Sequence, residues 1–265
     1  MYQISGLSIG FIGISLILCL TVPVFAVYYM KRQQGATLRS FLIGMMTFIF
    51  FALIAEQALH MLVLGMFQDY MTDPKHLLVY AMYGGLAAAV FEETGRFVAM
   101  KYLMRNHLYK KEALMYGLGH GGVEAILIGG IGSFSNLATA LSINSGALDA
   151  SIAAHDQNII AAVEQMVAMP SWQFLLVGVE RMAAMVLHVC LSYLVYRAVK
   201  HGRVECFGAA LLIHFLVDAV TVFLAAKLPV LVIEIGIILV DCVLAFFVYR
   251  MYQSEVAAEV PGITL

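Results

Sequence analysis

The sequence predicts an all-α protein, a polytopic membrane helix bundle of about seven transmembrane helices. First, 62% of the 265 residues are hydrophobic and only 12% carry a formal charge. In a soluble domain, about a quarter of the residues are charged. Second, apolar runs long enough to cross a bilayer recur along the chain. Third, basic residues gather in alternate connections between these runs, as is typical of membrane proteins.

The spans follow from the rule that a transmembrane helix needs about 20 apolar residues. The first run is preceded by no Lys or Arg and contains no small-residue cleavage site, so we interpret it as a retained span and not a secretory signal. No polar stretch is long enough for a soluble module. We therefore expect residues 1–265 to form a single transmembrane domain, with spans near 5–30, 41–66, 77–104, 113–135, 172–199, 206–226 and 230–252.

The extracytoplasmic connection 136–171 is longer than the others. It first continues as a helix rich in Ser, Ala and Asn and then becomes amphipathic around residues 149–169. Pro170 and Trp172 mark the return to the membrane, where Trp is a typical interfacial anchor. The sequence leaves three roles open for segment 146–169: a cap on the bundle, a gate, or a contact with a partner.

The positive-inside rule gives an orientation. Two of the fifteen Lys and Arg residues, Arg96 and Arg181, lie mid-span, and the side opposite the main group holds Lys75 and Lys227. We therefore expect a multi-pass plasma-membrane protein with its N-terminus outside and its C-terminus in the cytoplasm. The eleven basic residues of the cytoplasmic side are Lys31, Arg32, Arg39, Lys101, Arg105, Lys110, Lys111, Arg197, Lys200, Arg203 and Arg250.

The remaining composition says little about partners. The net charge is −2, and we expect the lipid bilayer as the environment and no nucleic-acid partner. The four cysteines form no C-x-x-C pair and lie in or beside apolar runs, so we interpret them as small buried hydrophobes. They are Cys19, Cys190, Cys206 and Cys242.

Ionisable side chains lie inside the apolar spans, where an ionised group costs at least about 2.5 to 3.5 kcal/mol. Such groups pair, protonate or line a cavity. With a rise of about 1.5 Å per residue, those of four spans fall at one level, between the midplane and the cytoplasmic leaflet. We interpret this level as a site. Its members are Glu92, Glu93, Arg96, His120, Glu124, His188, His214 and Asp218.

Local spacing supports the site. Three i, i+4 pairs each share one helix face: His120 with Glu124, His214 with Asp218, and Glu92 with Arg96, which can neutralise one another. The run from Tyr116 to Glu124 is rich in glycine, which allows either close helix packing or close approach of a substrate.

Other intramembrane ionisable residues have structural interpretations. We interpret Glu56 with His60 as an interhelical polar clamp and Glu180 with Arg181 as a structural ion pair. Glu234 and Asp241 are expected to support the site or to pack.

The order of these motifs resembles the YhfC family of intramembrane peptidases. The motifs are Glu-Glu-Thr-Gly-Arg at 92–96, Tyr-x-x-x-His at 116–120 with Glu124, and His-x-x-x-Asp at 214–218. That family is grouped with the CPBP superfamily of CAAX-prenyl proteases and bacteriocin-processing proteins, and more distantly with PrsW. The resemblance covers roughly residues 40–250 and implies a CPBP-like fold. The superfamily usually has one more residue before the Arg, and Asn where this chain has Asp218.

The resemblance implies an intramembrane endopeptidase, a hydrolase that acts on membrane-embedded proteins or lipidated, membrane-anchored peptides. Glu92 would be the general base that activates water, helped by His120, although the spacing leaves the choice between Glu92 and Glu93 open. Arg96 would hold the two carboxylates in place. His214 and Asp218 would stabilise the oxyanion.

A metal-dependent version of this activity competes with metal-free glutamate chemistry. His120, Glu124, His188 and His214 offer nitrogen and oxygen ligands that suit zinc, with Glu92 or Glu93 as base. No H-E-x-x-H helix is present, so the sequence favours the metal-free version and requires no cofactor. Zinc stays the candidate metal.

Three other functions fit the same residues. The main alternative is a proton-coupled transporter or ion pathway, because chains of Glu, His and Asp serve as proton relays, although no internal repeat is evident. A haem protein with His188 and His214 as axial ligands is a third hypothesis, and a purely structural subunit is a fourth. The sequence identifies neither a substrate nor an oligomeric state.

Overall fold

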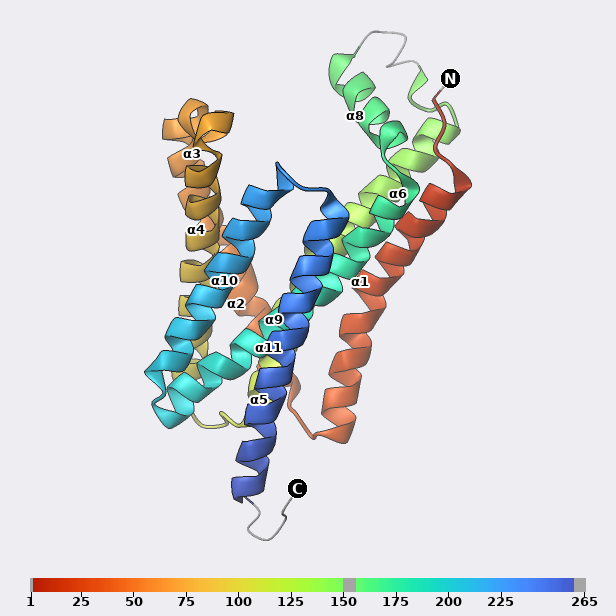
Figure 1. Ribbon diagram of the computed structural model, residues 1–265. Helices are drawn as coiled ribbons and strands as arrows, with labels where there is room; N and C mark the ends of the chain where they lie inside the picture. Colours follow the sequence, from red (N-terminus) through yellow and green to blue (C-terminus); the bar gives the residue numbers. More distant parts are fainter. Residues whose placement is uncertain (1, 150–155, 260–265) are drawn as a thin grey trace. The chain divides into compact units, whose positions relative to one another are not determined.

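The computed structural model describes residues 2–149 and 156–259 (Figure 1). Every regular element in these residues is helical, which confirms the predicted all-α class. Among them, six helical elements are long and apolar enough to cross a membrane. They are Gly6–Gln33, Leu38–Thr72, Lys110–Asn144, Ser171–His201, Val204–Ala225 and Val230–Ala257. The predicted polytopic helical membrane protein is therefore confirmed.

The seventh expected span, 77–104, is also helical. It consists of α4, Leu77–Val98, and a π-helical continuation η3, Ala99–Leu103. It carries Glu92, Glu93 and Arg96, and it is not one of the six elements that meet the criteria of length and apolar composition. A membrane crossing by α4 therefore stays a prediction.

Two other long elements contain a π-helical segment. The second span consists of α2, Leu38–Phe50, then η1, Phe51–Glu56, and α3, Gln57–Thr72. The fourth consists of α5, Lys110–Glu124, then η4, Ala125–Gly130, and α6, Ile131–Asn144. Single π turns occur frequently at functional sites. Here η1 ends at Glu56, and η4 begins directly after Glu124.

The remaining helices are α1, Gly6–Gln33, α8, Gln157–Ala168, and α9, Ser171–His201, followed by α10, Val204–Ala225, and α11, Val230–Glu259. Gly35 and Gly202 adopt φ values of 60° and 67°. Because only glycine tolerates such angles easily, they let the chain turn directly after α1 and α9. A 3₁₀ turn, η2, covers Pro74–His76 before α4.

The chain forms two compact units. Unit 1 comprises Met1–Phe25 and Glu124–Met182, and unit 2 comprises Ala26–Val123 and Ala183–Leu265. Three helical elements, α1, α5–α6 and α9, run from one unit into the other. That the whole chain acts as a single transmembrane domain stays a prediction.

Unit 1 contains the connection 136–171, which the sequence predicts to be longer than the others. Asp156 caps α8 by accepting hydrogen bonds from the main-chain N–H groups of Asn158 and Ile159, as short polar side chains commonly do. Val163 and Met166 of α8 are buried in the core of this unit, as expected for the amphipathic part of segment 146–169. Residues 150–155 of that segment lie outside the described residues.

Unit 2 is built around the glycine-rich helix α5. A Cβ atom at Gly117 would lie 2.6 Å from the Cα atom of Val189 on α9. At Gly119 it would lie 2.1 Å from the carbonyl oxygen of Phe41 on α2. Distances this short leave no room for any side chain, so glycines permit α2 and α9 to pack directly against α5. Of the two roles that the sequence left open for these glycines, the structure shows the packing role.

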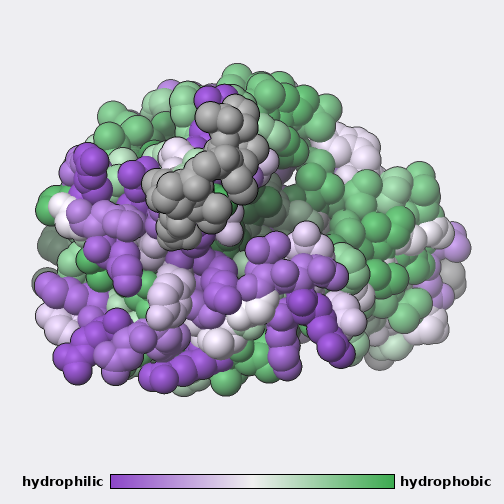
Figure 2. Space-filling view, turned by 90° about the horizontal axis from the view of Figure 1, so that it is seen from below, coloured by the Kyte–Doolittle hydropathy of each residue, from purple (hydrophilic) through white to green (hydrophobic). Residues whose placement is uncertain are grey.

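Polar residues collect at one end of unit 2. Lys31 and Arg32 lie in the last turn of α1, and Lys200 and His201 in the last turn of α9. Hydrophilic residues gather on the face that Figure 2 shows, with hydrophobic residues beside them. This agrees with the grouping of basic residues in the sequence, whereas the side of the membrane that this end faces stays a prediction.

Candidate active site

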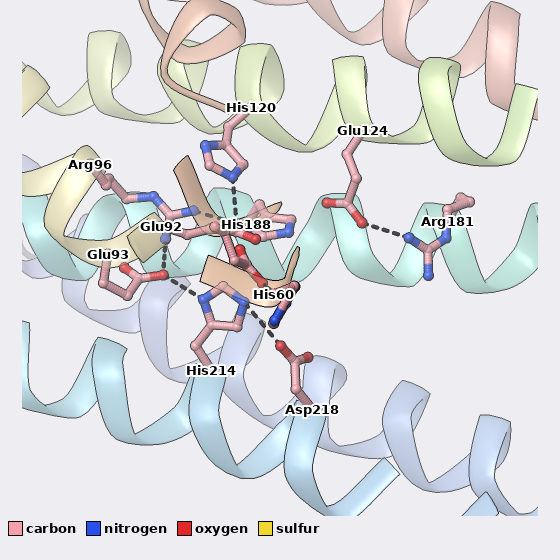
Figure 3. Close-up of polar contacts among 11 residues, drawn as sticks. His60, Glu92, Glu93, Arg96, His120, Glu124, Arg181, His188, His214 and Asp218 are labelled. Carbon is pink, nitrogen blue, oxygen red and sulfur yellow. Dashed lines mark hydrogen bonds and ion pairs between the residues drawn. The ribbon is translucent and has the colours of Figure 1, made fainter. Parts of the chain in front are cut away.

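Six ionisable side chains of unit 2 are buried together (Figure 3). They come from helices α4, α5, α9 and α10, the four spans whose ionisable side chains were predicted to lie at one level. Glu93, Arg96 and His120 have no exposed surface at all. Burial this complete is expensive unless each charge has a partner. The six are Glu92, Glu93, Arg96, His120, His188 and His214.

Arg96 pairs with Glu93 on the same turn of α4. Its Nη1 atom donates to Oε1 of Glu93 over 2.5 Å, and its Nη2 atom lies 3.0 Å from Nδ1 of His188 on α9. The i, i+4 spacing predicts instead that Arg96 neutralises Glu92. That prediction is wrong, because the next residue, Glu93, lies at i, i+3 on the face that Arg96 shares, while Glu92 is turned toward α5.

Glu92 faces two histidines. Its Oε2 atom lies 2.8 Å from Nε2 of His120 and 3.9 Å from Nδ1 of His188. The rings of these two histidines lie 4.7 Å apart between centroids. One ligating atom from each of the three residues lies within 4.8 Å of the other two. Glu92, His120 and His188 are therefore a compact set of one oxygen and two nitrogen ligands.

A second branch runs from Glu93 to α10. Nδ1 of His214 lies 2.8 Å from Oε1 of Glu93, and Nε2 of the same ring lies 3.4 Å from Oδ2 of Asp218. His214 and Asp218 thus form the i, i+4 pair that their spacing predicts. The other oxygen of Glu93, Oε2, is buried and has no hydrogen-bond partner among the described residues. It is an open acceptor inside the cluster.

Apolar and small residues close the cluster on the α5 side. The ring of Phe48 on α2 meets the ring of His120 edge-on, with centroids 5.1 Å apart. A Cβ atom at Gly121 would lie 3.1 Å from Cβ of His188. Because α5 has no side chain at Gly121, the imidazoles of His120 and His188 can approach each other. No motif in the sequence pointed to the contact with Phe48.

Glu124, an expected metal ligand, has a different partner. It belongs to unit 1, where its Oε1 atom contacts Nη1 of Arg181 at 2.5 Å. Arg181 also pairs with its neighbour Glu180. The structural ion pair expected between Glu180 and Arg181 is therefore present, and it includes Glu124 as a second carboxylate (Figure 3).

Glu56 and His60 form a hydrogen bond on one helix, with 3.1 Å between Oε1 and Nε2. The contact between helices comes from the other ring nitrogen, because Nδ1 of His60 lies 2.8 Å from the hydroxyl oxygen of Tyr83 on α4. Tyr83 completes the expected clamp, and nothing in its sequence context marked it. On α11, Glu234 and Asp241 are buried, with 6% and 4% of their surface exposed.

The set of Glu92, His120 and His188 fits a catalytic metal by its chemistry. Two imidazoles and one carboxylate are the protein ligands of many zinc hydrolases, which leave a further position for water. His120 Nδ1 is buried without a hydrogen-bond partner, so its ring is not committed elsewhere. Arg96 would compete with a metal for His188, because it contacts the same Nδ1 atom that faces Glu92. The sequence had proposed His120, His188 and His214 with Glu124, and the structure groups only the first two of these with Glu92.

Fold and site together define a polytopic membrane protein with a buried cluster of Glu, His and Arg. The chain belongs to the YhfC family, since residues 18–240 match the family described as YhfC intramembrane metalloprotease. It is similar to the uncharacterized membrane protein YhfC of Bacillus subtilis (strain 168), with 35% identity over 216 residues, which are 81% of this chain and 84% of the relative. No solved structure matches. The family resemblance noted in the sequence is thus confirmed, and the link to the CPBP superfamily stays a prediction.

Proposed function

We propose that the chain is an intramembrane metalloprotease, an endopeptidase that hydrolyses peptide bonds of membrane-embedded or membrane-anchored substrates. The observation that carries this proposal is the buried set of Glu92, His120 and His188, whose ligating atoms lie within 4.8 Å of one another. The family description favours the metal-dependent version over the metal-free version that the sequence favoured. The lipid bilayer is the environment of both enzyme and substrate.

Glu92, His120 and His188 would hold the metal, and zinc is the candidate that suits this ligand set. A divalent metal there would supply Lewis-acid chemistry, which lowers the pKa of a bound water and polarises a peptide carbonyl. This assignment gives Glu92 a ligand role, so that the role of base passes to its neighbour.

Glu93 is the proposed general base. Arg96 and His214 both engage Oε1, which holds the carboxylate in one orientation, while Oε2 is open. In the reaction, the oxygen of a water bonds to the carbonyl carbon of the substrate and its proton passes to Oε2 of Glu93. The C–N bond then breaks, and Glu93 returns the proton to the leaving amine.

His214 and Asp218 would act on the substrate oxygen. The imidazole of His214 lies between Glu93 and Asp218, and when protonated it would offer positive charge to the tetrahedral intermediate. Asp218 has the most accessible side chain of the site residues, with 36% exposed. We therefore propose that substrate approaches the site past Asp218, between α10 and its neighbours.

The proposal is tested by cleavage in proteoliposomes. The purified protein is incubated with transmembrane peptides and with a prenylated peptide, and new termini are detected by mass spectrometry. We expect cleavage by the wild type, loss of cleavage with a zinc chelator, and loss in Glu93→Gln and His120→Ala. Glu234→Gln is the control, because Glu234 is another buried acid, on α11, to which no catalytic role is assigned.

Two results would contradict the proposal. Cleavage that persists in Glu93→Gln and with the chelator would remove both the base and the metal from the mechanism. A pH-driven ion flux through liposomes, without cleavage of any substrate and abolished by Asp218→Asn, would favour the proton-coupled transporter instead.

A further inference from the structure

A cavity of about 450 Å³ follows α3 in unit 2. Its lining begins at Gln57, the residue after Glu56, and reaches Thr72, where α3 ends beside the η2 turn. At about 1.5 Å per residue, this stretch of helix is about 20 Å long. The polar side chains along it are Gln57, His60, Gln68, Thr72 and, from α4, Tyr80. The cavity therefore extends from the end of α3 to Gln57 and His60, which are next to Glu56 in the sequence and in hydrogen-bond contact with it, respectively.

His60 and Glu56 connect this cavity to the candidate active site. His60 lines the cavity and contacts Glu56. Glu56 in turn interacts electrostatically with Glu92, His214 and Asp218. The π-helical segment η1 ends at Glu56, directly before Gln57, the first residue that lines the cavity. Figure 3 shows the ring of His214 beside Asp218.

The exposure of the side chains increases along this route. Glu93 and His214 are 0% and 4% exposed, Glu56 is 9% exposed, and His60 is 21% exposed. A hydrolytic site consumes one water molecule per turnover, and a buried water needs two to four polar partners. Along the described residues of α3, such polar partners line the cavity as far as His60 and Gln57. The apolar side chain of Met61, 73% exposed, also lines the cavity, whereas Leu62 lies outside the lining and is 61% exposed.

We propose that the cavity along α3 is the aqueous entrance of the site, and that Glu56 and His60 form its inner neck. Water would pass from the cavity, between the carboxylate of Glu56 and the imidazole of His60, to Glu92 and His214. On the predicted orientation the entrance opens on the extracytoplasmic side. The use of this water in hydrolysis rests on the proposed function, whereas the hydration of the cavity does not.

Hydration is tested by cysteine labelling in a variant whose four native cysteines are replaced by Ala. Single cysteines are introduced by Gln57→Cys and Gln68→Cys in the cavity, and by Leu62→Cys as a control on the outer face of the same helix. Each purified variant is checked for monodispersity in detergent and reconstituted into proteoliposomes. It then reacts with a charged, membrane-impermeant thiosulfonate. Because thiolates form only in water, we expect both cavity positions to react about tenfold faster than the control.

Two labelling results would overturn the entrance. If the cavity cysteines are as inert as Leu62→Cys, the cavity is filled by lipid. If all three positions react equally, the whole face of α3 is in water and the cavity is not a distinct route.

The neck is tested by kinetics on a cleaved peptide. We expect His60→Phe, which fills the neck with an apolar ring, to lower kcat about tenfold with KM unchanged, because water supply and not substrate binding is affected. His60→Asn, which keeps a polar side chain, should restore most of kcat. An unchanged kcat in His60→Phe would overturn the role of the neck. Labelling at the cavity positions of the cysteine variants, together with a wild-type protein that cleaves nothing, would leave the entrance in place and contradict the protease.

Discussion

The ion pair of Arg96 and Glu93 carries the strongest stability prediction, because both side chains are 0% exposed. The replacement Arg96→Met keeps much of the side-chain volume but leaves Glu93 as a buried carboxylate with His214 as its remaining partner. Removal of one partner from a buried pair typically costs about 3–5 kcal/mol. We expect Arg96→Met to lower the free energy of unfolding by that amount, measured by denaturation of the purified protein in detergent micelles.

A surface pair provides the matched control. Arg203 and Glu205 lie 3.3 Å apart with side chains that are 60% and 65% exposed, and an exposed pair contributes at most about 1 kcal/mol. Arg203→Met should therefore have little effect. The double variant Arg96→Met with Glu93→Leu should lower the free energy of unfolding by less than the sum of the two single variants, because no unpaired charge remains. If Arg96→Met lowers the free energy of unfolding no more than Arg203→Met does, the reasoning from burial is refuted.

Two further predictions concern the metal and the helix packing. His188→Ala should lose metal that co-purifies with the wild type, whereas His214→Ala should retain it, as measured by mass spectrometry of metal content; loss in both variants would return His214 to the ligand set. Gly119→Ala should destabilise the protein by about 1–3 kcal/mol through overpacking, since its Cβ atom would lie 2.1 Å from the carbonyl oxygen of Phe41. Gly65→Ala, with no atom within 4 Å of its Cβ, should be neutral or stabilising, and equal thermal stabilities of the two variants would contradict the packing.

The helices could be predicted because the length of each apolar run shows directly whether it can cross a bilayer. The fourth span and its helical continuation toward Asn144 follow directly from composition, and so does the amphipathic character of α8. The pair of His214 and Asp218 could be predicted for a similar reason, since residues four apart on one helix are neighbours whatever surrounds them. These predictions depend only on local geometry.

Contacts between helices were harder to predict, because they depend on how each helix is rotated about its axis. The residues Glu92 and Glu93 look equivalent in the sequence, but successive helical residues point about 100° apart, so one faces His120 and the other faces Arg96. Glu124 was assigned to the site because it shares a helix face with His120. The structure pairs it with Arg181, a residue that the sequence had matched only with its own neighbour.

The charges of the cluster favour a bound cation that the chain itself does not supply. Glu92, Glu93 and, through His214, Asp218 contribute three carboxylates, and Arg96 balances one of them. Two net negative charges in a low-dielectric interior are costly. One proton can sit on the imidazole of His214, between Glu93 and Asp218, without occupying a carboxylate oxygen. A second proton on Glu92 would remove the charge that a metal ligand needs. A divalent cation beside Glu92 would offset the remaining negative charge and leave Glu93 ionised, so the same ion would serve both the charge balance of the folded site and the proposed hydrolysis.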